Sequence, residues 1–128
     1  MDCHCQVVLR SDDGERCFGP GPAQLLEEVE RLGSLQQAAK AMYLSYTKAL
    51  RMLQRAEAAF GCPLLVRTAG GSQGGGSALT SEGRQLLARY RALEAAVRTE
   101  AAEQFAAIFS APDRASDGHS CGLSPKGL

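Results

Sequence analysis

Residues 34–61 have the sequence SLQQAAKAMYLSYTKALRMLQRAEAAFG, which predicts two helices separated by a short turn. Ser34 caps the first helix, with a glutamine three residues on to complete a capping-box pattern. The turn falls around Tyr43, and Ser45 caps a second helix that ends at Gly61. Two short helices joined by a tight turn form a helix-turn-helix.

The second of these helices has two opposed faces, because successive side chains are rotated by about 100°. The apolar face, which we expect to be buried, comprises Tyr46, Ala49, Leu50, Leu53, Ala56 and Phe60. The other face carries Lys48, Arg51 and Arg55 within an arc of about 60°, flanked by Thr47 and Gln54. In a DNA major groove these side chains would donate to guanine edges and phosphates and pair with adenine, although an ordinary solvated basic face has the same composition.

A glycine-rich hairpin is predicted directly after the helices. Residues 64–68 read as a strand, residues 69–77 contain five glycines, and residues 78–80 form a returning strand. Such a hairpin would be a wing whose glycines let the backbone approach a sugar–phosphate strand. The predicted contacts of the wing are Arg67, Gly71, Ser72 and Gln73. The alternatives are a flexible linker and a nucleotide phosphate loop, and the second lacks the usual Gly-Lys-Ser/Thr ending.

The segment before residue 34 is expected to form a small hairpin and a helix. Alternation over residues 3–10 predicts a strand, residues 11–14 a turn and residues 15–18 the returning strand. A helix then runs from about Pro22 to Gly33. Its apolar stripe is Leu25, Leu26, Val29 and Leu32.

A long helix is predicted from residue 81 to about residue 110, followed by a disordered tail over residues 111–128. It would extend roughly 40 Å, which is too long for a small domain to cover. The near-heptad stripe comprises Leu86, Tyr90, Leu93, Val97, Gln104 and Ile108, with Phe105 adjacent. The first half can cap the monomer core, whereas beyond Val97 we expect a partner helix and hence a homodimer. The predicted fold is a mainly helical winged helix-turn-helix with small β hairpins, forming one domain over residues 1–110 with this dimerisation helix.

The net charge is zero, from 14 basic and 14 acidic residues, which taken alone argues against a polyanionic partner. The charges are unevenly distributed, however. Residues 40–91 hold eight basic and two acidic side chains, so the predicted helix-turn-helix and wing are positive and the remainder is negative by the same amount. This asymmetry favours a nucleic-acid partner.

Five cysteines, an odd number without an export signal, favour reduced thiols and a cytoplasmic protein. Cys3, Cys5 and Cys17 have side chains suited to zinc or copper, but their spacing matches no closed site and we favour small buried thiols. No nucleophile with a base and an orienting partner is present, so we expect no enzyme activity. We expect no membrane segment, because no apolar run reaches the roughly 18 residues of a membrane span. We also expect no cofactor and no small-molecule effector, because no ligand site is evident.

A resemblance to known regulators rests on residues in both halves of the predicted domain. They are Leu25-Leu26, Gly33-Ser34-Leu35, Ala38-Ala39, Leu44-Ser45-Tyr46, Ala49, the glycines at 70–71 and 74–76, Leu79-Thr80 and Gly83. Over roughly residues 5–98 the sequence resembles the N-terminal domain of ModE-type, molybdate-responsive transcription regulators and, more loosely, the winged helix of LysR-type regulators.

The resemblance implies a homodimeric bacterial protein that binds double-stranded DNA. Ser45, Tyr46, Thr47, Lys48 and Arg51 would meet the groove, and Arg67 with the wing would meet the backbone. Leu50, Glu57 and Gln73 depart from the family, which often has Trp, Asn and Lys at these positions. Family members that sense molybdate carry further oxyanion-binding domains, so we expect a stand-alone module without an evident molybdate site.

Two alternatives stay open at this point. One is a protein-interaction module on the same scaffold, which would hold its partner through the long helix or through Glu27, Glu28 and Glu30. The other is a thiol- or metal-responsive switch in which the N-terminal cysteines control DNA binding.

Overall fold

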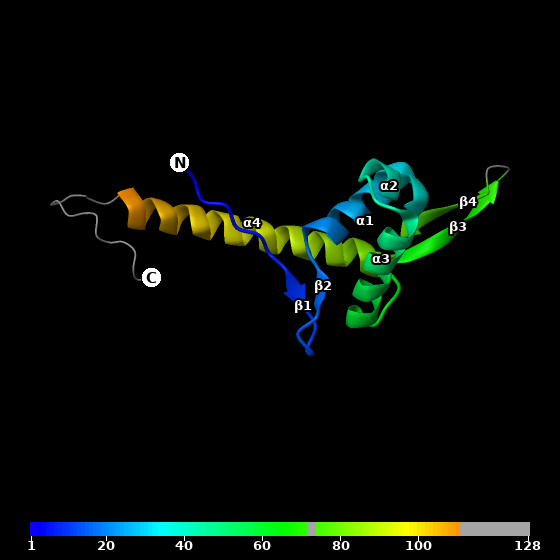
Figure 1. Ribbon diagram of the computed structural model, residues 1–128, viewed down its shortest axis with the longest axis horizontal. Helices are drawn as coiled ribbons and strands as arrows, with labels where there is room; N and C mark the ends of the chain where they lie inside the picture. Colours follow the sequence, from blue (N-terminus) through cyan, green and yellow to red (C-terminus); the bar gives the residue numbers. More distant parts are fainter. Residues whose placement is uncertain (72–73, 111–128) are drawn as a thin grey trace. The chain divides into compact units, whose positions relative to one another are not determined.

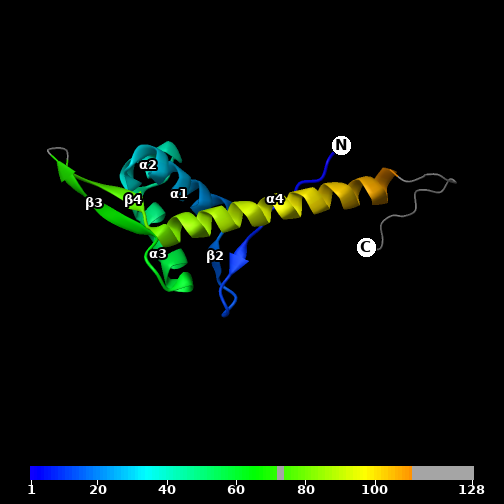
Figure 2. The ribbon, with the colours of Figure 1, turned by 180° about the vertical axis from the view of Figure 1, so that it is seen from behind.

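The computed structural model describes residues 1–71 and 74–110, and within them the chain forms four helices and two antiparallel hairpins (Figure 1, and from behind in Figure 2). The elements are β1 (Leu9–Arg10), β2 (Arg16–Phe18), α1 (Pro20–Leu32), α2 (Leu35–Ala41), α3 (Tyr46–Phe60), β3 (Leu65–Gly71), β4 (Gly74–Leu79) and α4 (Ser81–Ser110). This order confirms the predicted, mainly helical winged helix-turn-helix with a long C-terminal helix. The predicted contacts Ser72 and Gln73 and the predicted tail lie outside the described residues.

The chain divides into two units. Gln6–Glu94 form the larger unit, which contains both hairpins, α1 to α3 and α4 as far as Glu94. Met1–Cys5 and Ala95–Leu128 form the other unit. Within the second unit the rings of Phe105 and Phe109 stack with their centroids 4.9 Å apart.

The helix starts follow the local capping signals. The Ser34 hydroxyl accepts a hydrogen bond of 3.1 Å from the Gln37 N–H at the start of α2. The Ser45 hydroxyl accepts one of the same length from the Lys48 N–H at the start of α3. Both bonds satisfy an N–H that has no partner inside its helix. Helix α1 begins at Pro20, slightly earlier than predicted, because proline is well suited to the first helical position.

Three positions with positive φ end the helices and turn the chain. Gly33 and Gly61 cap α1 and α3 in the left-handed region, with φ of 73° and 72°. Tyr43 has φ of 58° in the turn between α2 and α3, where its N–H donates to the Lys40 carbonyl. The predicted helix-turn-helix is therefore present with its predicted boundaries.

Small residues bring α1, α2 and α3 close together around one core. Ala38 and Ala39 of α2 and Ala49 and Ala56 of α3 are all buried. The larger buried side chains are Phe18, Leu25, Leu26, Val29, Leu35, Leu53, Leu64, Leu79, Leu87 and Tyr90. The Tyr90 ring lies edge-on to Phe18, at 5.1 Å between centroids, and its hydroxyl donates to the Val7 carbonyl at 2.6 Å. Val7 and the first half of α4 thus close the core together.

Two sequence predictions, one for the first strand and one for helix α3, are wrong in part. The predicted strand over residues 3–10 is reduced to β1, because its pairing partner β2 is only three residues long. The apolar stripe of α3 is shorter than predicted, since Tyr46 and Phe60 are 43% and 41% exposed at the two ends of the helix. Leu50 is only partly buried against the core, as is Met52, which the predicted stripe omitted.

The wing strands extend further into the glycine-rich stretch than predicted. Leu65 pairs with Leu79 and Arg67 with Ser77, and the ladder is still present at Gly71 and Gly74 after a change of register. Strand pairing uses only main-chain groups, so glycines do not prevent it when a partner strand is adjacent.

The base of the wing is attached to the helices on both sides. The Ser77 N–H donates to the Gly33 carbonyl at 2.9 Å, at the end of α1. The Thr80 hydroxyl accepts from the Gly83 N–H at 2.9 Å, which makes Thr80 the cap of α4, and donates to the Pro63 carbonyl at 2.7 Å. These bonds set where the wing leaves the helical core.

Candidate nucleic-acid interface

Helix α3 presents the predicted cationic face to solvent. Ala49, Leu53 and Ala56 are buried, so the opposite side of the helix is turned outward. The exposed residues on that side are Thr47, Lys48, Arg51, Gln54 and Arg55. Ser45 and Tyr46, at the start of the helix, are also exposed. The outward side of α3 thus carries the predicted Thr47, Lys48, Arg51, Gln54 and Arg55 together, whereas Tyr46 belongs to the apolar stripe and is exposed at the start of the helix.

The positive charge of this face is not compensated within the described part of the chain. The three ion pairs found there involve Arg31 and Arg91, whereas Lys48, Arg51 and Arg55 have none. The Arg91 guanidinium donates from Nε to the Glu27 carboxylate at 2.8 Å and from Nη1 to the Glu94 carboxylate at 2.7 Å. These hydrogen bonds raise the pKa of Arg91, and the bond to Glu27 has the larger effect. A cationic face without ion pairs attracts a polyanion. Arg91, in contrast, is engaged in ion pairs within the chain.

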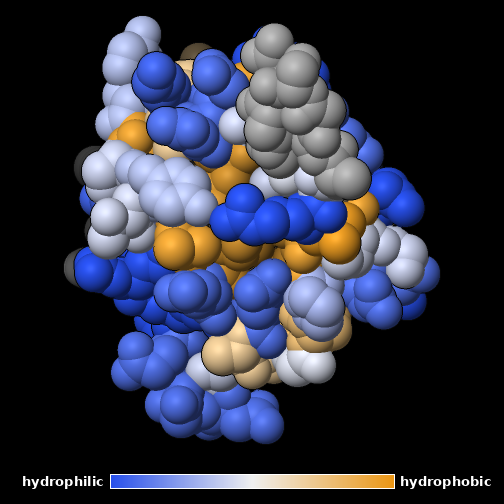
Figure 3. All heavy atoms as spheres, turned by 90° about the vertical axis from the view of Figure 1, so that its right-hand side faces the viewer, coloured by the Kyte–Doolittle hydropathy of each residue, from blue (hydrophilic) through white to orange (hydrophobic). Residues whose placement is uncertain are grey.

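The wing adds one exposed cation close to its base. Arg67 lies on β3 opposite Ser77 and is exposed, without an ion pair among the described residues. Gly71 lies at the end of β3, paired with Gly74. Figure 3, which views the molecule from the side of the wing, shows hydrophilic side chains over much of this face and an apolar area in its middle.

Glu57, which departs from the family pattern, links α3 to the segment before the wing. Its carboxylate accepts a hydrogen bond of 2.8 Å from the Leu64 N–H, just before β3. The bond ties the C-terminal half of α3 to the start of the wing. Its only sequence signal is an acidic residue a few positions before a Gly-Cys-Pro turn, which does not identify the acceptor's partner.

The predicted dimerisation residues of α4 differ widely in exposure. Tyr90 is 1% exposed and belongs to the core of the single chain, so its assignment to a dimer surface is wrong. Leu86, Val97 and Phe105 are partly exposed, and Leu93 and Ile108 are 42% and 69% exposed. Leu86 and Leu93 also line a groove of about 350 Å³, whose apolar residues include Phe60 and Leu64.

The N-terminal cysteines differ in exposure. The expectation of buried thiols is wrong for Cys3 and Cys5, which are exposed. Cys17 is buried, and its thiol donates to the Leu9 carbonyl at 3.5 Å. Burial raises the pKa of the Cys17 thiol. Over residues 1–71 and 74–110, no three His, Cys, Asp or Glu side chains come together as a group that could hold a metal ion.

The acidic residues of α1 are largely engaged within the chain. Glu27 pairs with Arg91 and Glu28 with Arg31, so of the three glutamates only Glu30 has no ion pair among the described residues. This surface is therefore a weaker docking site for a protein partner than its sequence suggested. No helix in the described ranges combines the length and hydropathy needed to span a membrane.

Comparison with known proteins adds independent evidence. Residues 23–84 match the family of bacterial regulatory helix-turn-helix proteins of the lysR type. The molybdenum transport protein ModE of Azotobacter vinelandii is 49% identical over 71 residues, which are 56% of this chain and 26% of that protein. The transcriptional regulator ModE of Haemophilus influenzae is 41% identical over 75 residues, 59% of this chain and 29% of that protein. The chain therefore spans less than a third of the length of either relative.

A solved structure agrees with this assignment. The DNA-binding domain in the crystal structure of the CbnR_DBD–DNA complex is 30% identical, with a TM-score of 0.53. The match covers 68% of this chain and 95% of that domain. Residues 23–84 are a helix-turn-helix domain of the lysR family of bacterial regulatory proteins.

Proposed function

We propose that the protein is a sequence-specific, DNA-binding transcriptional regulator whose helix α3 enters the major groove of double-stranded DNA. The observation that carries the proposal is the face of Lys48, Arg51 and Arg55, which is exposed and has no ion pair within residues 1–71 and 74–110, while the opposite side of α3 is buried. One relative is named a transcriptional regulator, and the matched CbnR domain was solved with DNA. A regulator of this kind acts in the cytoplasm and needs no enzyme activity.

The side chains of α3 divide the work of recognition by their chemistry. The planar guanidinium of Arg51 can donate two parallel hydrogen bonds to the O6 and N7 atoms of guanine. Lys48, as a compact charge, suits a phosphate or a single guanine acceptor. Arg67 on the wing is placed to contact the phosphate backbone, which fixes the register of α3 without reading sequence.

Salt-dependent binding tests this proposal. Duplexes that the protein selects from genomic fragments are compared with shuffled duplexes for the wild type, Arg51→Ala, Lys48→Ala and the control Arg98→Ala, an exposed position on α4. We expect Arg51→Ala to weaken binding to the selected duplex about tenfold and to reduce discrimination against the shuffled one. Lys48→Ala should lower the slope of log K against log salt by about 0.9 if it contacts a phosphate. A folded wild type that binds no duplex at low salt would refute the proposal.

We further propose that the protein acts as a homodimer through α4. The support is the set of exposed Leu93 and Ile108 and partly exposed Val97, apolar side chains at heptad-like spacing that a second copy of the helix could cover. Two-fold symmetry would present two copies of α3 to half-sites about 34 Å apart, or a multiple of that distance. No small-molecule effector is assigned.

A further inference from the structure

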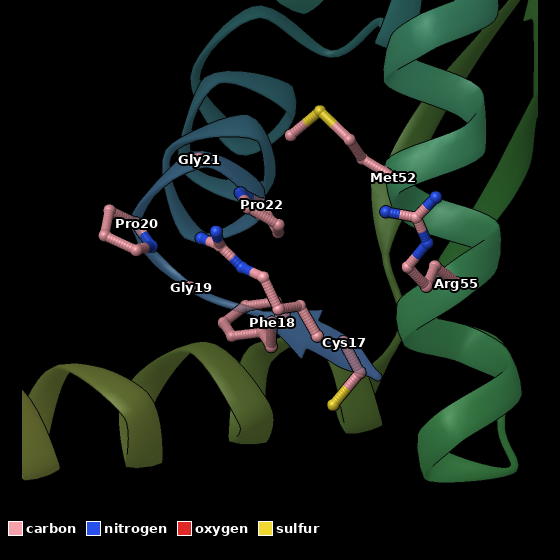
Figure 4. Close-up of a pocket in the computed structure, with 9 residues that line it drawn as sticks. Cys17, Phe18, Gly19, Pro20, Gly21, Pro22, Met52 and Arg55 are labelled. Carbon is pink, nitrogen blue, oxygen red and sulfur yellow. The ribbon is translucent and has the colours of Figure 1, made fainter. Parts of the chain in front are cut away.

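A cleft of about 300 Å³ lies between β2, the start of α1 and α3 (Figure 4). It is lined by Arg16, Cys17, Phe18, Gly19, Pro20, Gly21, Pro22, Met52 and Arg55. Figure 4 shows the Arg55 guanidinium extending from α3 toward the side of the cleft formed by Pro22. The cleft thus joins a cation of the β1–β2 hairpin with a cation of the helix that we propose meets DNA.

The two guanidinium groups in the cleft have no counter-charge among the described residues. Neither Arg16 nor Arg55 takes part in an ion pair there. Asp13, in the turn of the same hairpin, is engaged locally, because its carboxylate accepts from the Ser11 hydroxyl and the Glu15 N–H. These bonds, first that from Ser11, lower the pKa of Asp13. Two cations that share a cleft repel each other and together attract an anion.

Glycines keep the cleft open on the side of α1. A Cβ atom at Gly21 would lie 3.3 Å from the Met52 Cε, so a side chain there would narrow the space. Gly19 caps α1 without a side-chain hydrogen bond. An occupant can therefore approach the main chain in a cleft that both arginines line.

We propose that this cleft binds a phosphate group of the DNA backbone. Arg55 shares the exposed face of α3 with Lys48 and Arg51, so a phosphate held by Arg55 continues the proposed groove contact along the helix. Arg16 makes the β1–β2 hairpin a second backbone contact, and Figure 1 draws the two hairpins on either side of α3. The inference rests on the proposed function and adds to it a site that joins residues far apart in the sequence.

The test compares Arg16→Gln with the matched control Arg10→Gln. Arg10 is exposed and pairs with Arg16 across the hairpin, but it does not line the cleft. Both changes remove one charge from the same hairpin, and thermal unfolding checks that both variants fold. We expect Arg16→Gln to bind selected and shuffled duplexes about tenfold more weakly and to lower the salt slope by about 0.9, with little change for Arg10→Gln.

The double variant Arg16→Gln/Arg55→Gln tests whether the two arginines share one phosphate. If the two arginines share one phosphate, the fold-loss of affinity of the double variant is smaller than the product of the fold-losses of the two single variants. The reason is that the second substitution removes a contact that the first has already broken. Fully multiplicative losses would overturn the shared site.

Two further outcomes separate this inference from the proposed function. If the wild type binds duplex DNA but Arg16→Gln behaves like Arg10→Gln, the cleft is no DNA contact and the proposed function is unaffected. If the folded wild type binds no duplex, both fail. Titration with inorganic phosphate, followed by the NMR signals of the arginine Nε–H groups, identifies the source. Saturation by phosphate together with unchanged DNA binding by Arg16→Gln would assign the cleft to a free anion and overturn the DNA assignment.

Discussion

Glu57 shows how a single side chain supports the proposed interface without touching DNA. Its carboxylate holds the Leu64 N–H at 2.8 Å in a partly buried position. We expect Glu57→Ala to lower the free energy of unfolding by about 1–2 kcal/mol, because a buried donor loses its acceptor. Glu57→Gln keeps an acceptor oxygen and should cost less than half as much. Urea unfolding at neutral pH measures both, and equal losses would contradict this role.

Tyr90 links pH to stability through one hydroxyl. Burial, and secondly Glu94, raise the pKa of Tyr90, whose hydroxyl donates to the Val7 carbonyl. Because the folded-state pKa lies above the unfolded value of about 10, the stabilisation is complete below pH 10 and is lost as pH rises through the folded-state pKa. Tyr90→Phe should cost about 1 kcal/mol at neutral pH. Urea unfolding up to about pH 10.5 should show that the difference in free energy of unfolding between the wild type and Tyr90→Phe becomes smaller. A difference that stays constant with pH would contradict this link.

At the scale of elements, α4 begins in close contact with the segment before β3. A Cβ atom at Gly83 would lie 2.3 Å from the Leu64 carbonyl oxygen, so only glycine fits this first turn. We expect Gly83→Ala to lower the free energy of unfolding by about 2–3 kcal/mol, although alanine is the better helix former.

Gly21→Ala, in the first turn of α1, is the matched control for this substitution. Its Cβ would meet only the flexible end of Met52, at 3.3 Å. The net change should stay within about 0.5 kcal/mol, because helix propensity offsets the contact. Chemical unfolding compares the two, and similar costs would show that the Leu64 contact does not decide the packing of α4.

The helices of this fold are predicted from sequence more accurately than the strands. The boundaries of α2 and α3 and the end of α1 are predicted because caps such as Ser34 and Gly61 act on their own main chain within three or four residues, whereas the start of α1, which has no side-chain cap, lies earlier than predicted. The ends of strands β1 and β3 are not predicted, because a strand extends only as far as its partner. The cationic face of α3 follows from helical periodicity, whereas the presence of Arg16 and Arg55 along one cleft depends on how a hairpin packs against a helix.

At the scale of the whole molecule, the proposed homodimer depends on α4. We expect the double variant Leu93→Glu/Ile108→Glu to shift sedimentation equilibrium toward the monomer, because buried carboxylates without partners are costly at a helix interface. Thr99→Glu, an exposed position about half a turn away from Val97, is the control. Equal association of both variants would place the dimer surface elsewhere.

Dimerisation and DNA binding are coupled in this proposal. A weakened dimer that still folds should lose affinity for a two-half-site duplex much more than for a single half-site, since linking two binding modules raises their effective concentration. Titration of both duplexes with the Leu93→Glu/Ile108→Glu variant measures this. Equal losses on the two duplexes would mean that the copies bind independently.

The sequence by itself determined the helix-turn-helix, the position of the wing and the uneven distribution of a zero net charge, because these follow from local capping, helical periodicity and composition. The tertiary structure decided which of these residues act together. It placed Tyr90 in the core instead of at a partner surface, gave Glu57 its acceptor role beside Leu64, and brought Arg16 to the cleft of Arg55. Each of these three placements depends on packing between segments that are distant in the chain. The contacts that stabilise such packing are not encoded in any local sequence pattern.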